Sequence, residues 1–360
     1  MSAPLQNLSA SCLVASPYDE GVVRKAARAC HEQLGADPDL VLAFVSSDYQ
    51  KSVSSFLESI QIDGRASTII GGSASGLIGT GAEIENTSGF SLLFLKMPST
   101  RIKILEKLPA KGITAPTLLL TNASSDTLDS LLETWNHDST PHPLIGCGIT
   151  GGPEEEDLFL FSQEGLIDGD TLCLELKNGI QVVPLLAHGC RPIGEPVIVT
   201  RANESEVLEL ARQEPFDVLE EAFEALGTEL QVEADGHIFA GLAIDEETED
   251  FGSADFQIRQ IVGATLEDGR LRLESPVRPG QTLQFLWRDP LAAEMELRVA
   301  CEDIKKMHGS PFAATLFAGK GRDKALFGVE NRNISIFEDT FAQLPLAGMH
   351  SFGEFGAASP

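Results

Sequence analysis

Residues 146–151 read Gly-Cys-Gly-Ile-Thr-Gly, which has the glycine spacing of a dinucleotide-binding loop. Such a loop holds a pyrophosphate only when the N-terminus of a helix follows it directly. Here Gly152, Pro153 and three glutamates follow, whose charges would repel phosphate, and the next element that we expect, at 157–163, is a strand. The sequence therefore predicts no dinucleotide site at this loop.

Other motifs that could carry catalysis are also incomplete. Gly319-Lys320 looks like the end of a phosphate-binding loop, but Ala314 stands where its first glycine is needed. Ser73 lies among glycines, yet Ser75 breaks the G-x-S-x-G pattern of a hydrolase nucleophile. We therefore expect no catalytic residues and no cofactor, and the chain is not expected to be an enzyme.

The seven histidines show neither H-x-x-x-H nor H-E-x-x-H spacing, and the six cysteines include no C-x-x-C pair. We expect no metal site on these grounds. Ligands that are distant in sequence stay open, because spacing alone does not test them.

Three apolar runs end in glycine-rich turns. Ile69-Ile70 leads into residues 71–76, Leu144-Ile145 into residues 146–152, and Leu346-Ala347 into residues 348–356. Glycine at the end of a strand permits a positive φ angle or a close approach of the backbone to another group. That group is either a neighbouring strand or a ligand held by exposed backbone N–H groups, and both interpretations stay open.

The heptapeptide His188–Gly194 contains Arg191, one of few cations in an acidic chain. One interpretation is a turn whose arginine pairs with a carboxylate of the fold. The other is a fixed guanidinium aimed into a pocket, suited to an anionic group such as a carboxylate. The residues by themselves favour the first.

The elements that must position these residues alternate between helices and strands in the first part of the chain. Apolar residues recur at helical spacing in three segments, 20–34, 53–60 and 128–135. Strands are expected between them, at 39–46, 67–71, 89–96, 101–106 and 116–120. From 140 to 202 the predicted strands follow too closely for crossover helices: 143–146, 157–163, 170–177, 179–188 and 195–202. Asn178-Gly179 is the strongest hairpin signal.

The later part repeats this scheme. A helix begins at Pro215 and ends at Gly227, and the acidic stretch 227–236 marks a domain boundary. Strands follow at 237–243, 257–265, 270–273, 282–287 and 312–318, with helices from Asp289-Pro290 to Met307 and at 334–343, and a final strand at 345–356. We expect a mixed α/β fold (α+β) with two halves, each with mixed, largely antiparallel sheets covered by helices. The predicted domains are an N-terminal extension, 1–19, and halves at 20–228 and 229–360.

Composition limits the partners. The chain has 26 Lys+Arg against 54 Asp+Glu, a formal net charge of −28. Such a field repels nucleic-acid backbones and anionic membrane surfaces, so neither is an expected partner. Scattered cysteines, the absence of a basic, apolar leader at the N-terminus and the short apolar runs predict a cytoplasmic protein.

Four segments, in order along the chain, resemble the FIST (F-box and intracellular signal transduction) family. Cys190-Arg-Pro-Ile-Gly194 is similar to the strand-turn that closes the N-terminal half of that family. Ile70–Gly76, with Gly81-Ala-Glu83, looks like the same half's glycine-rich strand exit. Residues 316–328 resemble the F-x-x-x-G-R…L-F-G signature of the C-terminal half, and residues 345–356 resemble its P-L-A-G…G-E-I-G ending.

The resemblance implies a sensory module that binds a small molecule, such as an amino acid or its derivative, and a separate signalling protein as output partner. A protein–protein adaptor without a small ligand is the alternative, and an enzyme of unknown reaction comes third. Gly319, Ser351 and Arg332-Asn333 depart from the family pattern, which leaves chemistry at those positions in doubt. The residues expected to bind a ligand are Gly72, Ser73, Gly76, Cys147, Gly148, Arg191, Gly348, His350, Gly353 and Glu354, with Glu83 or Glu354 receiving an amino group.

Overall fold

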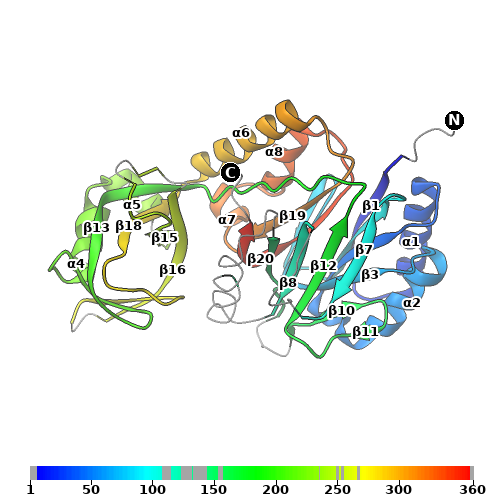
Figure 1. The fold of residues 1–360 in the computed structure, drawn as a ribbon, viewed down its shortest axis with the longest axis horizontal. Helices are drawn as coiled ribbons and strands as arrows, with labels where there is room; N and C mark the ends of the chain where they lie inside the picture. The colour runs from blue at the N-terminus through cyan, green and yellow to red at the C-terminus, as the bar shows by residue number, and fades with distance from the viewer. Residues whose placement is uncertain are drawn as a thin grey trace. The chain divides into compact units, whose positions relative to one another are not determined.

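The structure, a computed structural model, describes residues 6–107, 115–122, 132, 144–152, 157–234, 236–248, 251–252, 255–265 and 268–356. It divides into two compact units, each described by itself. The sandwich unit contains the described residues up to 186 and from 298 onward, and the barrel unit contains those of 187–297. Figure 1 shows the elements of both units, coloured along the chain.

One sheet of the sandwich unit has six strands, and its central strands are buried on both faces. The strand order is β1 (Leu8–Ala15), β6 (Gly89–Lys96), β2 (Leu40–Ser46), β3 (Ile69–Ala74), β10 (Leu160–Ser162) and β11 (Gly165–Leu166). Only the β2–β3 pairing in this sheet is parallel. The apolar stripes of α1 (Glu20–Leu34) and α2 (Val53–Asp63) pack on one face of this sheet. Asp19 caps the first turn of α1, and Gly35 ends the helix in the left-handed conformation.

The second sheet has eight strands and packs against the other face of the first. Its order is β5 (Ala82–Glu85), β4 (Gly76–Gly79), β20 (Leu346–Gly356), β9 (Leu144–Gly148), β8 (Thr117–Thr121), β12 (Thr171–Lys177) and β7 (Arg101–Leu105), with β19 (Ala314–Gly319) parallel to β20. The core between the sheets joins Phe44 and Leu93 of the first to Leu172 and Met349 of the second. The helix α8 (Arg332–Thr340) contacts β5 of this sheet through Ile334 and Glu83, and the candidate site lies there.

Three further helices complete the described elements of this part of the chain. The short helix η1 (Ser47–Ser52) follows β2, and α7 (Lys324–Phe327) precedes α8. The helix α6 (Pro290–His308) begins within the barrel unit's residues and ends within those of the sandwich unit.

The barrel unit is a closed antiparallel barrel. Its strand order is β13 (Cys190–Asn203), β14 (Glu206–Leu210), β17 (Arg270–Leu273), β16 (Phe256–Thr265), β15 (Ile238–Ala243) and β18 (Thr282–Arg288). Val199, Leu283 and Trp287 lie in its core, and Phe216 and Leu219 of α4 (Pro215–Glu224) pack against it. The short helix α5 (Thr228–Ala234) follows. Closure removes the exposed strand edges that an open sheet would present.

The expected mixed α/β fold with largely antiparallel sheets is confirmed, but several local predictions differ from the structure. The segment 179–188 contains no strand, so the predicted hairpin at Asn178-Gly179 is wrong, although both residues adopt the positive φ angles of such a turn. Strand β1 lies inside the predicted N-terminal extension and pairs with β6 along its whole length. The helix predicted at 128–135 falls almost entirely outside the described residues.

The division into compact units is also distinct from the predicted halves. Residues 187–297 form one unit inside the chain, and the segments before and after them together form the other. The predicted boundary at 228–229 remains a prediction about the two sequence halves.

Candidate functional site

The three glycine-containing segments lie next to one another in the sandwich unit. Strand β4 pairs with β20 through Leu77↔Met349, and β20 pairs with β9 through Phe352↔Gly148. The Thr150 hydroxyl, just after β9, donates to the carbonyl of His350 at 2.5 Å. The Thr150 hydroxyl oxygen also accepts the N–H of Ser75 at 3.0 Å, so Thr150 connects all three segments.

Close approach of neighbouring strands explains several of these glycines. A Cβ atom on Gly71 would lie 1.6 Å from the carbonyl oxygen of Ala43. On Gly146 it would lie 1.9 Å from that of Leu119, and on Gly348 1.9 Å from that of Leu316. Of the two interpretations left open by the sequence, the adjacent strand therefore accounts for these positions.

Gly76 has a different neighbour, the imidazole of His350. A Cβ on Gly76 would lie 2.7 Å from His350 Cδ2. Glu85 lies directly opposite Gly76 on the next strand, and Glu83 lies opposite Ile78. Because residues opposite each other in a sheet share a face, the missing side chain of Gly76 leaves room for the ring of His350 to reach toward both carboxylates. His350 Nε2 lies 3.4 Å from Glu83 Oε2.

Glu83 connects this face of the sheet to the N-terminus of α8. Its Oε1 accepts the N–H of Ile334 at 2.9 Å, and its Oε2 accepts the Asn333 side-chain amide at 3.1 Å. Its own N–H donates to Asn331 Oδ1 at 2.7 Å. Burial would raise the pKa of Glu83, but the contacts with His350, Ile334 and Asn333 outweigh it and hold that pKa below the ordinary value. The carboxylate is therefore ionised at neutral pH, and the helix N-terminus favours that charge.

Asn333 extends the network to a buried arginine. Its side-chain amide also donates to the carbonyl of Arg322 at 2.8 Å, and Arg322 Nε donates to Asn333 Oδ1 at 3.2 Å. Arg322 is 6% exposed. Glu85, Arg322 and Asn333 are not among the site residues predicted from the sequence. The signals were present in the Gly321-Arg322 motif and in the unusual Arg332-Asn333 pair.

Cys147 on β9 and Ser351 and Glu354 on β20 form a second polar group. Ser351 Oγ donates to Glu354 Oε1 at 2.6 Å, and a Cβ on Gly319 would lie 2.8 Å from Glu354 Oε2. Burial, with the charge of Glu354, raises the pKa of the Cys147 thiol far above its ordinary range, although a hydrogen bond with Ser351 opposes the shift. The thiol therefore stays protonated, and a protonated thiol is a poor nucleophile.

The remaining predicted residues have positions of other kinds. Ser73 is fully buried, and its hydroxyl accepts the N–H of Phe159 at 3.1 Å. Gly72 faces Ile149, and Gly353 has a φ of 57°. Arg191 is not in a turn: it lies in β13 of the barrel unit, and its guanidinium pairs with the buried carboxylate of Asp289. The ligand role of all ten residues stays a prediction.

Two hollows lie on the surface of the sandwich unit. One, of about 440 Å³, borders α8 and the turn between β4 and β5, and its lining includes Gly81, Asn331, Ile334 and Glu338. Asn331 and Ile334 are the residues that hold Glu83, so this hollow, which we call the α8 hollow, adjoins the buried network.

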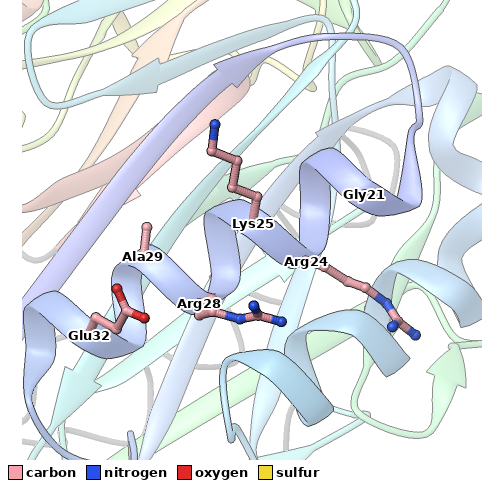
Figure 2. A pocket seen from close by; sticks show the side chains of 6 residues that line it. All are labelled: Gly21, Arg24, Lys25, Arg28, Ala29 and Glu32. Atoms are coloured by element: carbon pink, nitrogen blue, oxygen red, sulfur yellow. The ribbon is translucent and has the colours of Figure 1, made fainter.

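The other hollow, of about 330 Å³, runs along α1 (Figure 2). Figure 2 shows the side chains of Arg24 and Arg28 extending from one side of this helix. Both arginines pair with the carboxylate of Asp63, and Arg24 pairs with Glu20 as well. Their charges are therefore already compensated within the fold.

The chain belongs to the family of proteins with FIST domains. The FIST N domain matches residues 39–213, and the FIST C domain matches residues 215–357. FIST domains are generally sensory domains of signal transduction. The resemblance seen in the sequence is thus confirmed for both halves.

Related chains occur in mycobacteria. An uncharacterised protein of Mycobacterium tuberculosis (strain H37Rv) is 28% identical over 344 residues, which cover 92% of this chain and 90% of the relative. An uncharacterised protein of Mycobacterium bovis is 31% identical over 240 residues, 66% of this chain and 62% of the relative. Within the described residues, no helix has the length and apolar character needed to cross a membrane.

Proposed function

We propose that this chain is a cytoplasmic sensory module that binds a small zwitterionic or anionic metabolite, such as an amino acid or its derivative. One observation carries the proposal. Glu83, from the segment matched by the FIST N domain, and His350 and Asn333, from the segment matched by FIST C, form one buried polar network beside a hollow. A ligand at that hollow would contact segments from both family domains.

The lining of the α8 hollow offers carboxylates to the ammonium group of a zwitterion. Glu338 and Asp339 line it, and the guanidinium of Arg298 lies 2.9 Å from Asp339. An ammonium group pairs with the Glu338 carboxylate, and a ligand carboxylate would compete with Asp339 for the guanidinium of Arg298, which is not itself part of the lining. A hollow of about 440 Å³ is in the size range of small-molecule sites.

The proposed module has no catalytic role of its own. The hydroxyl of Ser73 holds the backbone of Phe159, and the Cys147 thiol is kept protonated. The output therefore requires a signalling protein as partner. The cytoplasmic assignment is supported by the cysteines: all six lie among the described residues, and none forms a disulfide.

Thermal unfolding across a panel of amino acids and their derivatives tests the proposal. A ligand that binds only the folded state stabilises it by RT ln(1+[L]/Kd), about 2.7 kcal/mol at a hundredfold excess over Kd. We expect at least one zwitterion to raise the melting temperature, and Glu338→Gln to remove that increase. The matched control is Glu32→Gln in the α1 hollow, which should keep it. No response across the panel, or an equal response of both variants, would overturn the proposal.

An adaptor function has its own supporting observation. Leu291, Met295 and Val299 follow one another at helical spacing on α6 and are 53–65% exposed. An exposed apolar stripe of this kind suits a protein partner. An adaptor would lose its partner on Met295→Glu and show no metabolite response, whereas a metabolite sensor with this substitution would keep its thermal shift.

A further inference from the structure

We propose that His350, Glu83 and Glu85 bind one divalent transition-metal ion of the zinc class. Each of the three side chains offers one ligand atom, and these atoms all lie within 4.8 Å of one another. Imidazole nitrogen together with carboxylate oxygen is a donor set that suits Zn²⁺. This inference rests on the geometry of the three side chains and is independent of the metabolite proposal.

The buried imidazole is the observation that points to a ligand. The His350 side chain is 7% exposed, and among the described residues its Nε2 has no hydrogen-bond partner. A buried polar nitrogen that makes no hydrogen bond is costly, so such atoms call for an explanation. A metal ion would take the lone pair of Nε2 and remove that cost.

The separation between Nε2 and Glu83 Oε2 supports coordination. At 3.4 Å, these atoms do not form a hydrogen bond in the structure. Two ligand atoms that each lie about 2.0–2.1 Å from a tetrahedral zinc ion stand roughly 3.3–3.4 Å apart. The observed spacing is compatible with two ligands around one ion.

Hydrogen bonds from neighbouring residues fix the orientation of the Glu83 carboxylate, as a metal site requires. Ile334 N–H and the Asn333 amide donate to the two oxygens of Glu83, and each oxygen keeps a further lone pair for a metal. Such outer partners fix the orientation of metal-binding carboxylates.

Glu85 and Gly76 complete the arrangement. Glu85 lies opposite Gly76, over which the His350 ring passes, and Ala318 is the register partner of His350 on the other side. Three protein ligands leave a fourth tetrahedral position open, as in zinc sites that exchange a ligand. From the sequence, Glu83 and His350 are predicted as binding residues for a small molecule, but they are not joined with Glu85 as metal ligands, because β5 is far in sequence from His350.

Isothermal titration of the full chain, stripped with a chelator, with Zn²⁺ alone tests the proposal. We expect one equivalent bound with high affinity, and a second, weak phase from the acidic surface. His350→Gln and Glu85→Gln should each weaken the tight phase by about tenfold or more, because each removes a ligand. Glu85→Gln leaves the Glu83 contacts to α8 intact, so this variant should fold normally.

Two further variants separate coordination from general charge. Glu330 lies in the turn before α8, and its exposed carboxylate pairs with Lys324. Glu330→Gln should leave the tight phase unchanged. Gly76→Ala keeps all three ligands but adds a Cβ 2.7 Å from the His350 ring, so it should weaken the tight phase by displacing that ring. The absence of a tight phase in the wild-type chain, or a tight phase unaffected by Glu85→Gln and His350→Gln, would overturn the proposal. Either result would leave unaffected the separate test of the metabolite proposal, the thermal shift of wild type and Glu338→Gln.

Discussion

The position of His350 depends on a residue that has no side chain. Gly76 stands between the histidine on β20 and the carboxylates on β5, and a methyl group there would meet the imidazole. The same residue type at 71, 146 and 348 allows neighbouring strands to approach each other. Glycine thus has two functions in these two sheets, and at Gly76 the missing side chain brings ionisable groups together.

Glu83→Gln should make the protein less stable near neutral pH by about 1–3 kcal/mol, because a buried charged acceptor of two hydrogen bonds is lost. The pKa of Glu83 is lowered in the folded state, so its contribution is present above the ordinary value of 4.5 and is lost as the pH falls through the folded-state pKa. Urea unfolding of the metal-free protein should therefore show the difference between wild type and variant near pH 7 and a smaller one near about pH 3.

The control for this prediction is Glu330→Gln. Glu330 also has a lowered pKa, caused by Lys324, but its carboxylate is exposed and its ion pair is screened by solvent. We expect little change in stability from this variant at either pH. A difference between Glu83→Gln and wild type that grows toward acid would contradict the sign of the pKa shift.

The sequence located part of this site at the residue scale. The glycine runs and the motif residues led to Gly76, His350 and Glu83, whose proximity the structure shows. Glu85 and Asn333 were not predicted as site residues, because their importance comes from contacts with strands and helices that are distant in the sequence. Arg191 was predicted as a site residue because of its charge and its motif, but in the structure its guanidinium forms an ion pair with Asp289 of the barrel unit.

At the scale of elements, Asp289 carries out two tasks at the start of α6. Its carboxylate accepts the N–H of Leu291 at 2.8 Å, and its carbonyl accepts the first helical hydrogen bond, from Ala293 at 2.8 Å. Pro290 follows at the first helical position, which suits its fixed φ. This is why the Asp-Pro pair predicted the start of the helix correctly.

Asp289→Ala should lower the free energy of unfolding by about 2 kcal/mol, because it removes the cap and leaves Arg191 without its carboxylate. Arg191→Ala should cost about 1 kcal/mol or less, since its guanidinium is half-exposed and solvent screens the pair. Chemical denaturation of both variants measures this order. If the Arg191 guanidinium instead bound the metabolite, Arg191→Ala would leave the free energy of unfolding unchanged and abolish the stabilisation by the metabolite.

The apolar pattern of the sequence predicted a strand correctly where the residues of that segment are buried in the structure. The run 40–46 is buried at nearly every position and forms β2, as expected. The run 179–188 is also apolar, but its residues are only half-buried and Pro184 lacks the N–H that a central strand must donate. Apolar composition without a pairing partner does not make a strand.

At the scale of the molecule, the barrel could not be foreseen from pattern. Closing it requires β13 to pair with β18, as in Val197↔Leu283, and nothing in either segment specifies that partner. The units also cut across the order of the chain, because the sandwich unit is built from segments on both sides of residues 187–297.

Leu283→Ala should loosen the barrel unit selectively. Leu283 is fully buried in the barrel core, and such truncations cost about 2–5 kcal/mol. Because the sandwich unit has its own cores, backbone amides of β15 and β18 should exchange with deuterium faster while those of β2 keep their protection. Mass spectrometry of peptides after exchange measures both. Equal loss of protection in β2 would show that the two units unfold as one.

The placement of β20 has a consequence for how the chain reaches its native state. This strand enters the eight-stranded sheet between β4 and β9, both of which precede it by most of the chain's length. A polypeptide emerging from the ribosome therefore exposes the edges of β4 and β9 until β20 has been made. Pairings so remote in sequence slow folding, and the nascent N-terminal segments depend on a late strand to cover them. Premature termination before residue 346 would yield a product with two open edges, prone to aggregation.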